Sequence, residues 1–128
     1  MRDVRTAFSI AFNWNPSYSY AKIPAGLAVV PEYYSVLAQE VPREKGVPHL
    51  RNVKIYNLKA TGSREAFSVG SYPDSPLRDV TFRNIDIIAQ RAGTIQNAEN
   101  WKFENVRIQT ADGSRVALKE SRGVTGLQ

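Results

Sequence analysis

The segment Leu50-Arg-Asn-Val-Lys-Ile-Tyr-Asn-Leu-Lys-Ala60 decides the fold, because its pattern returns twice further along the chain. The pattern is found again in Leu77-Arg-Asp-Val-Thr-Phe-Arg-Asn-Ile-Asp-Ile87 and in Ala98-Glu-Asn-Trp-Lys-Phe-Glu-Asn-Val-Arg-Ile108. The three segments align without gaps and begin at positions 50, 77 and 98, which are 27 and 21 residues apart. Self-similarity at this period is typical of a solenoid, in which each repeat stacks on the next.

Each repeat is interpreted as two short strands joined by a corner at an asparagine. Val53 and Ile55 share one face by the two-residue period of a strand. The phase then slips at Asn57, and Leu58 and Ala60 share the next face. Asparagine tolerates left-handed backbone angles, and stacked asparagines can bond one another as a ladder. We therefore predict structural corners at the three aligned asparagines, Asn57, Asn84 and Asn105.

A third short strand is expected after each pair. These strands are Ala66–Val69, Thr94–Gln96 and Arg115–Leu118, and the opening segment Ala7–Phe12 has the same character. By alternation we expect an inward-pointing set that consists of Phe8, Ile10, Phe12, Phe67, Val69, Ile95, Val116 and Leu118, with Trp101 in an inward column of the repeats. The outward-pointing set is Ser9, Ala11, Ala66, Ser68, Thr94, Gln96 and Ala117.

Together these patterns predict an all-β, right-handed parallel β-helix of about three to four coils. The repeats are rich in Val, Ile and Phe at period two, which argues against helices. An antiparallel sandwich is the competing all-β interpretation, but it would not require the same pattern three times with Asn in one column.

We treat residues 1–128 as a single domain. Its parts are the first coil strand at 1–12, an irregular excursion at 13–48, the repeated coils at 49–118 and a tail at 119–128. A short helix is expected near 33–39. The excursion contains five of the seven prolines and a cluster of aromatic residues, which are Trp14, Tyr18, Tyr20, Tyr33 and Tyr34.

Composition excludes several classes of site. The chain has 128 residues, 42% of them hydrophobic and 23% charged, which suits one globular domain. It has no cysteine and a single histidine, His49, so disulfides, thiolate metal sites and multi-histidine sites are excluded. No metal or cofactor is expected. No apolar run approaches the roughly 20 residues of a membrane span, and no signal peptide is visible in MRDVRTAFSIAF, so localisation stays undetermined.

The net charge of +5 favours acidic partners in general. The cations are scattered among acids, however, as in Arg64-Glu65 and Arg78-Asp79, and no nucleic-acid motif is present. We therefore expect neither a nucleic acid nor a membrane as the partner.

Three stretches carry a family resemblance. Pro48-His-Leu-Arg-Asn-Val-Lys-Ile-Tyr-Asn-Leu-Lys-Ala-Thr-Gly62 and Ala66-Phe-Ser-Val-Gly-Ser-Tyr-Pro-Asp-Ser-Pro-Leu-Arg-Asp-Val-Thr-Phe-Arg-Asn-Ile85 resemble coils of the polygalacturonase-like proteins, glycoside hydrolase family 28. A third example is Ala98-Glu-Asn-Trp-Lys-Phe-Glu-Asn-Val106. The resemblance implies a right-handed parallel β-helix with a substrate groove across one sheet, in a family typically secreted or periplasmic. Family members hydrolyse galacturonide bonds of pectin with inversion.

The catalytic motifs of that family are missing from this sequence. The resemblance implies the motifs Asn-Thr-Asp, Asp-Asp, Gly-His-Gly and Arg-Ile-Lys, and none of them occurs here. Inverting hydrolysis needs two carboxyl groups roughly 6.5–9.5 Å apart, and none of the outward positions on the expected groove strands is acidic. No catalytic residue is therefore assigned. The chain resembles the C-terminal part of such an enzyme, cut after the catalytic coils.

Six residues are candidates for substrate binding. Arg64 precedes a groove strand and could hold a galacturonate carboxylate together with Lys59. Aromatic faces such as those of Tyr33 and Tyr34 can stack on sugar rings. The full set of candidates is Arg64, Ser68, Tyr72, Asp74, Tyr33 and Tyr34. Each also has a plain structural interpretation, as Asp74 does in the turn-forming Tyr-Pro-Asp-Ser-Pro loop.

We expect a non-catalytic C-terminal segment of a protein that processes pectin or polygalacturonate, with structural and carbohydrate-binding roles. The expected partner is an acidic polysaccharide such as galacturonan. Two alternatives stay open: a stand-alone carbohydrate-binding or oligomerisation module, and an active hydrolase with an unrecognised acid pair. Because the first coil would leave an open apolar end, a homodimer through that coil is also expected.

Overall fold

A computed structural model of the chain describes residues 1–12 and 20–127. The chain divides into two compact units, which are described separately. The first comprises Met1–Phe12 with His49–Gln128, and the second comprises Asn13–Pro48. The first unit contains all six described strands, and the second contains the two described helices.

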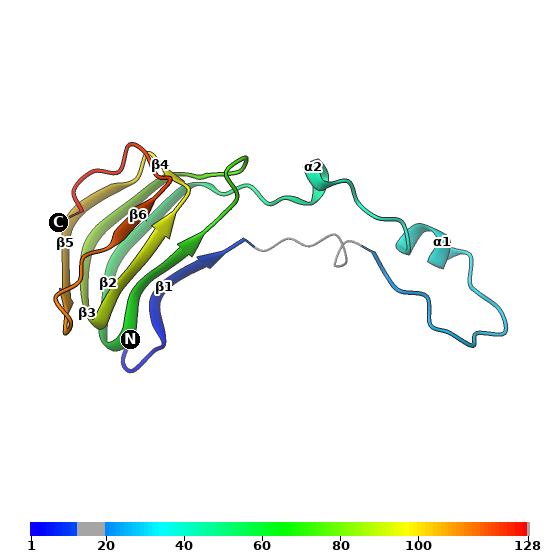
Figure 1. Cartoon of the computed structure of the whole chain (residues 1–128), viewed down its shortest axis with the longest axis horizontal. Helices are drawn as coiled ribbons and strands as arrows, with labels where there is room; N and C mark the ends of the chain where they lie inside the picture. Colours follow the sequence, from blue (N-terminus) through cyan, green and yellow to red (C-terminus); the bar gives the residue numbers. More distant parts are fainter. Residues whose placement is uncertain (13–19, 128) are drawn as a thin grey trace. The chain divides into compact units, whose positions relative to one another are not determined.

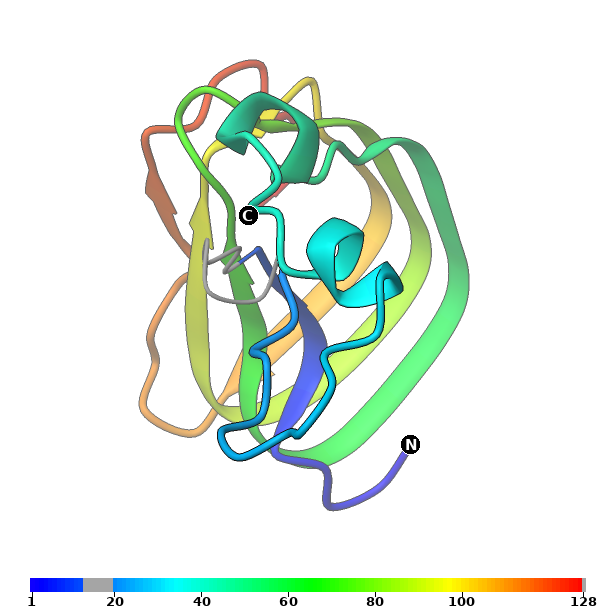
Figure 2. The same cartoon turned by 90° about the vertical axis from the view of Figure 1, so that its right-hand side faces the viewer.

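The strands of the first unit form one strongly curved parallel sheet (Figures 1 and 2). Strand β1 pairs with β2, β2 pairs with β3, and β3 pairs in turn with β4, β5 and β6. Every pair of named strands is parallel, which excludes the antiparallel sandwich. The strands are β1 (Thr6–Ala11), β2 (Arg51–Gly70), β3 (Leu77–Gln96), β4 (Ala98–Glu99), β5 (Lys102–Thr110) and β6 (Ala117–Lys119).

The register confirms the alignment of the three repeats. Ile55 lies opposite Phe82, and Phe82 lies opposite Phe103. The expected third strands also align, because Ser68 lies opposite Thr94 and Thr94 lies opposite Ala117. In β2 and β3 the expected separate strands merge into continuous strands of 20 residues that bend at their corners.

The asparagine corners are confirmed in detail. Asn57, Asn84 and Asn105 have φ angles of 57°, 57° and 51°, in the left-handed region. Asn84 Nδ2 donates to Asn57 Oδ1 at 3.0 Å, and Asn105 Nδ2 donates to Asn84 Oδ1 at 2.8 Å. A second column of left-handed corners, which was not predicted, lies five residues earlier in each repeat and consists of Asn52, Asp79 and Asn100.

Aromatic rings fill the space inside the curved sheet. Phe82, which is fully buried, stacks flat against Phe103 with ring centroids 4.9 Å apart and meets Phe67 edge to face at 5.6 Å. Trp101 is fully buried, as predicted, and its Nε1 donates to the Leu77 carbonyl oxygen at 2.9 Å. This bond satisfies the one polar atom of the indole ring, so the ring leaves no donor buried without an acceptor.

One predicted orientation is wrong, and one residue that was expected in the core is exposed. Ala66 was expected to face outward but is fully buried next to buried Phe67, so alternation fails at this point. Buried alanines occupy the aligned positions Ala7 and Ala92, which indicates that this column admits only a small side chain. Leu118 shares a column with buried Ile95, as the inward prediction requires, but it is 45% exposed, and among the described residues its strand β6 pairs with β3 only.

The second unit contains two short helices, α1 (Tyr33–Leu37) and α2 (Arg43–Gly46). Helix α1 confirms the helix expected near 33–39, whereas α2, which follows Pro42, was not predicted. Both are far too short to cross a membrane, and no other helix is described. Trp14 and Tyr18 of the aromatic cluster lie outside the described residues.

The asparagine ladder predicts the outcome of substituting its central member. Asn84→Ala removes two hydrogen bonds and forces alanine into a left-handed conformation, so it should lower the free energy of unfolding by about 2–3 kcal/mol. Asn84→Gly removes the same bonds without the backbone strain and should cost about 1 kcal/mol less. Urea denaturation of both variants measures the difference, and equal losses would contradict the left-handed corner.

Candidate functional site

A groove of about 510 Å³ crosses the face formed by β1, β2, β3 and β6. Its polar lining includes Ser68 from β2, Thr94 and Gln96 from β3, and Lys119 from β6. The parallel register places these residues in two neighbouring columns, because Ser68 lies opposite Thr94 and Gln96 lies opposite Lys119. Since adjacent strands are about 4.8 Å apart, the groove presents polar groups at a regular spacing.

Backbone geometry keeps the strands beneath this groove close together. Gly93 lies opposite Phe67 in the ladder and has a φ angle of 81°. A Cβ atom at this position would collide with the Phe67 carbonyl oxygen. Glycine therefore lets β3 keep its ladder with β2 at this left-handed residue, and the groove residues stay in register.

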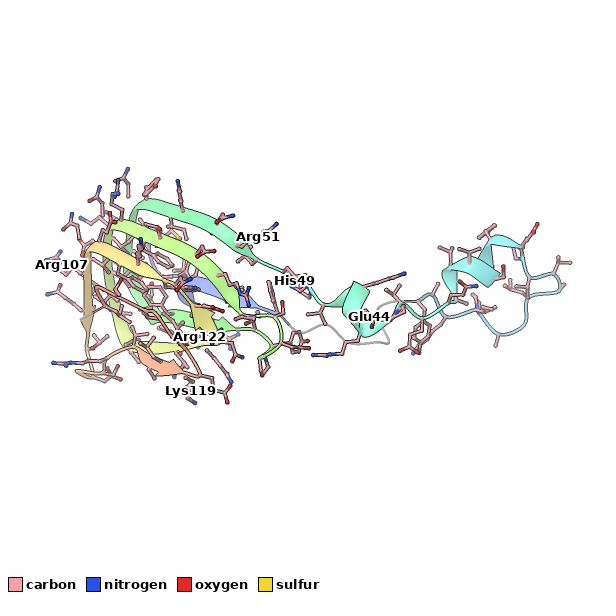
Figure 3. The ribbon with its side chains drawn as sticks, turned by 90° about the horizontal axis from the view of Figure 1, so that it is seen from above. Glu44, His49, Arg51, Arg107, Lys119 and Arg122 are labelled. Carbon is pink, nitrogen blue, oxygen red and sulfur yellow. The ribbon has the colours of Figure 1, made fainter. Side chains whose placement is uncertain are left out.

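The charged groups of the groove are distributed unevenly. Glu65 lines it, but its Oε1 lies 3.2 Å from Arg91 Nε, so this carboxylate is paired with a cation of the same surface. Lys119 is exposed, and its backbone carbonyl accepts bonds from Asn97 N at 3.0 Å and Ser121 Oγ at 2.8 Å. Figure 3 shows Lys119 at the edge of the sheet. The groove thus offers hydroxyl and amide groups beside the exposed side chain of Lys119.

A second hollow, of about 420 Å³, contains two acids, Glu99 and Glu120, together with Arg122. Glu99 lies between two guanidinium groups, with Arg78 Nε and Arg122 Nη2 each 3.1 Å from a carboxylate oxygen. Its Oε2 is buried without a hydrogen bond, so the Arg78 contact is an ion pair only.

The two hollows adjoin at one side-chain contact. Gln96, which lines the groove, donates through Nε2 to Glu120 Oε2 at 3.4 Å, and Glu120 lines the second hollow. A chain-like ligand lying in the groove would therefore meet the acids of the second hollow at its end.

The structure brings only one of the six predicted site residues into the groove, Ser68. Arg64 is exposed on β2 but does not line the groove, and its N–H donates to the Val4 carbonyl at 3.4 Å. Tyr72 begins a turn that Ser75 N closes by donating to the Tyr72 carbonyl at 3.0 Å.

The other candidates occupy separate places. Asp74 lies within that same turn, as its structural interpretation anticipates, and lines a different hollow together with His49, Arg51 and Arg78. His49 is joined there to Ser75, with Nδ1 and Oγ 2.9 Å apart. Tyr33 and Tyr34 belong to the second unit, where their rings stack with centroids 5.1 Å apart.

Lys119 is one of the groove residues that the sequence reasoning missed, because position 119 was assigned to the tail. The repeat alignment contains a signal for Lys119. If the alignment between Thr94–Gln96 and the last strand is extended by one residue beyond Leu118, Lys119 lies opposite Gln96.

Among the described residues of the first unit, two carboxyl groups have shifted pKa values, and both shifts go downward. Hydrogen bonding from Arg107 lowers the pKa of Asp86, with bonds of 2.9 and 2.8 Å. Hydrogen bonding from the side chain of Ser114, and then from its backbone N–H, which donates at 2.9 Å, lowers the pKa of Asp112. Both groups therefore stay ionised at neutral pH and are not proton donors. Among the described residues, no three His, Asp or Glu side chains gather closely enough to hold a metal ion.

The chain matches no protein-family model, and no curated protein or solved structure matches it significantly. The resemblance to polygalacturonase-like coils therefore depends on the quoted segments alone.

The ion pair between Asp86 and Arg107 predicts part of the loss of folding stability at acid pH. Because the pKa of Asp86 is lowered by folding, its contribution to stability is present above the unfolded value, about 4, and is lost as pH falls through the folded value. Asp86→Asn should therefore flatten the loss of stability below about pH 4. Thermal unfolding at several pH values measures this slope. Glu44→Gln, in the second unit, controls for loss of one carboxylate, and equal slopes in all three proteins would contradict the prediction.

Proposed function

We propose that the first unit is a right-handed parallel β-helix of three to four coils that binds an acidic polysaccharide without cleaving it. In this proposal the chain serves as the C-terminal, non-catalytic segment of a pectin-processing protein resembling glycoside hydrolase family 28. Three observations support the solenoid: parallel pairing throughout the named strands, repeats that stay in register, and asparagines that stack at one corner.

The observation that carries the binding proposal is the polar groove with a single cationic side chain, Lys119, among its lining residues. Hydroxyl and amide groups such as those of Ser68, Thr94 and Gln96 both donate and accept hydrogen bonds, as sugar hydroxyls do. Lys119 adds a positive charge for a uronate carboxylate. Repetition at strand spacing suits a polymer, because successive units of a chain can meet equivalent groups on successive strands.

Calorimetric titration with oligogalacturonate tests the proposal. Lys119→Gln should weaken binding about fivefold, since a solvent-exposed ion pair contributes at most modestly, and raising the salt concentration should weaken the wild type more than the variant. Lys102→Gln, on β5 outside the groove, is the matched control and should bind like the wild type. Absence of heat at millimolar ligand, or equal losses in both variants, would contradict binding in this groove.

One observation favours hydrolysis as a second candidate function, namely that Glu99 and Glu120 line the same hollow. An inverting mechanism would need one of them protonated at the leaving oxygen and the other ionised beside a water. Two guanidinium groups already engage the Glu99 carboxylate, so we favour a role in shaping the groove end.

Release of reducing ends from polygalacturonate separates the two candidates. We expect no release by the purified chain above a buffer blank. Release that disappears in both Glu99→Gln and Glu120→Gln would establish the hydrolase instead. Binding of oligogalacturonate by these variants, measured in parallel, shows that they remain folded.

A further inference from the structure

A further hollow, of about 460 Å³, crosses the outer face of β2, β3 and β5 and shares no lining residue with the polar groove. Buried residues flank Thr81 and Lys102 along their strands, so these two side chains point away from the core. We call this place the lysine hollow. Its lining includes Asn52, Lys54, Asp79, Thr81, Asn100 and Lys102.

One row of side chains crosses the lysine hollow from strand to strand. Lys54 lies opposite Thr81, Thr81 lies opposite Lys102, and Lys102 lies opposite Thr125 of the tail. The row therefore alternates between lysine and threonine, and both lysines are exposed. Because neighbouring strands are about 4.8 Å apart, the two lysines start about 9.6 Å apart, with Thr81 midway between them.

Another outward row of the same strands has a different residue in its middle position. In that row Asp86 lies between Lys59 and Arg107. Its carboxylate accepts two hydrogen bonds from Arg107, at 2.9 and 2.8 Å, and lies 4.0 Å from Lys59 Nζ. A lysine side chain therefore spans the distance to an acid on the next strand. The lysine hollow has the same arrangement of two cations, but its middle residue is the neutral Thr81.

The two lysines of the hollow have no acid partner. Among the residues that the structure describes, neither Lys54 nor Lys102 forms an ion pair. Lys102 has described residues of β3 and of the tail on its two sides, so its lack of an acid does not depend on what lies beyond β2. The acid among the lining residues is Asp79, whose Oδ1 accepts from Asn100 Nδ2 at 3.4 Å. The lining thus carries two positive charges and one negative charge.

We propose that the lysine hollow binds a phosphate group above Thr81. Lys54 and Lys102 reach the group from opposite sides, as the two cations of the other row reach Asp86, and the Thr81 hydroxyl donates a hydrogen bond to it. A phosphate group carries nearly two negative charges at neutral pH, so it balances both ammonium groups. The ligand is either free phosphate or the monoester of a small sugar. This site is separate from the polysaccharide groove and does not depend on the function proposed for it.

NMR titration of the isotope-labelled full chain tests this site. Inorganic phosphate should shift the backbone amide signals of Lys54, Thr81 and Lys102 and leave those of Ser68 and Thr94, in the groove, in place. The ionic strength is held constant, because salt screens exposed charges. Acetate, which has a single charge, should bind more weakly than phosphate. Galactose 1-phosphate is titrated separately: tighter binding than that of phosphate assigns the monoester as the ligand, and equal or weaker binding assigns the free ion.

Two substitutions in the hollow should change phosphate affinity in opposite directions. Lys102→Gln removes one of the two cations and should weaken binding about fivefold, the upper range for an exposed charge pair. Asp79→Asn removes the acid and should strengthen binding about threefold. Asparagine already occupies the aligned left-handed corners at Asn52 and Asn100, so this substitution should preserve the backbone. A gain in affinity cannot result from partial unfolding.

Two further variants control for position. Thr81→Asp places an acid between the lysines, where Asp86 stands in the other row, and should abolish phosphate binding. Lys119→Gln removes the cation of the groove and should leave phosphate binding unchanged.

Three results would overturn the proposal. They are the absence of shifts in the hollow at millimolar phosphate, equal affinity for phosphate and acetate, and an affinity that neither Lys102→Gln nor Asp79→Asn alters, which would indicate an adventitious ion only. Because no polysaccharide takes part, failure here is independent of the outcome of oligogalacturonate binding.

Discussion

Left-handed corners that stack in register are the constraint on which the rest of this structure depends. A strand of 20 residues such as β2 cannot enclose a core unless it bends, and it bends at Asn52 and Asn57, whose φ angles are 58° and 57°. Left-handed backbone is costly for most residues. Asparagine lowers that conformational cost, and its side-chain hydrogen bonds between repeats stabilise the folded state further. The corners therefore fix both the bend of each strand and its register with the next.

Core and groove lie on the same ladder between β2 and β3. This ladder sets Ile55 opposite Phe82 and, after a shift in register between Ala60 and Ser63, sets Ser68 opposite Thr94. Parallel stacking also has a cost, since each terminal repeat leaves a strand edge unpaired. The tail covers part of one end through Thr125, whereas the first half of β2 stays open among the described residues. The sheet therefore has a polar groove on its face.

The sequence allowed us to predict the features whose residue type is the same in all three repeats, but not those whose residue type varies. The corner at Asn57 was predictable because asparagine stands in all three repeats, whereas the second corner column escaped notice because one of its members is Asp79. Alternation predicts which face of the sheet a side chain occupies, but not how deeply other residues bury it. Leu118 was therefore placed in the core, although it is exposed. Alternation also fails at bends, as at Ala66. Lys119 was missed because the strand reaches one residue beyond its last apolar position.

Proton NMR of the chain in solution tests the parallel stack most directly. Parallel pairing predicts cross-strand contacts between backbone protons of Ile55 and Phe82 and of Phe82 and Phe103, together with contacts from the side-chain amide of Asn84 to Asn57 and Asn105. Strong Hα–Hα contacts between these segments, which the short Cα distances of antiparallel pairs produce, would contradict the stack and everything built on it.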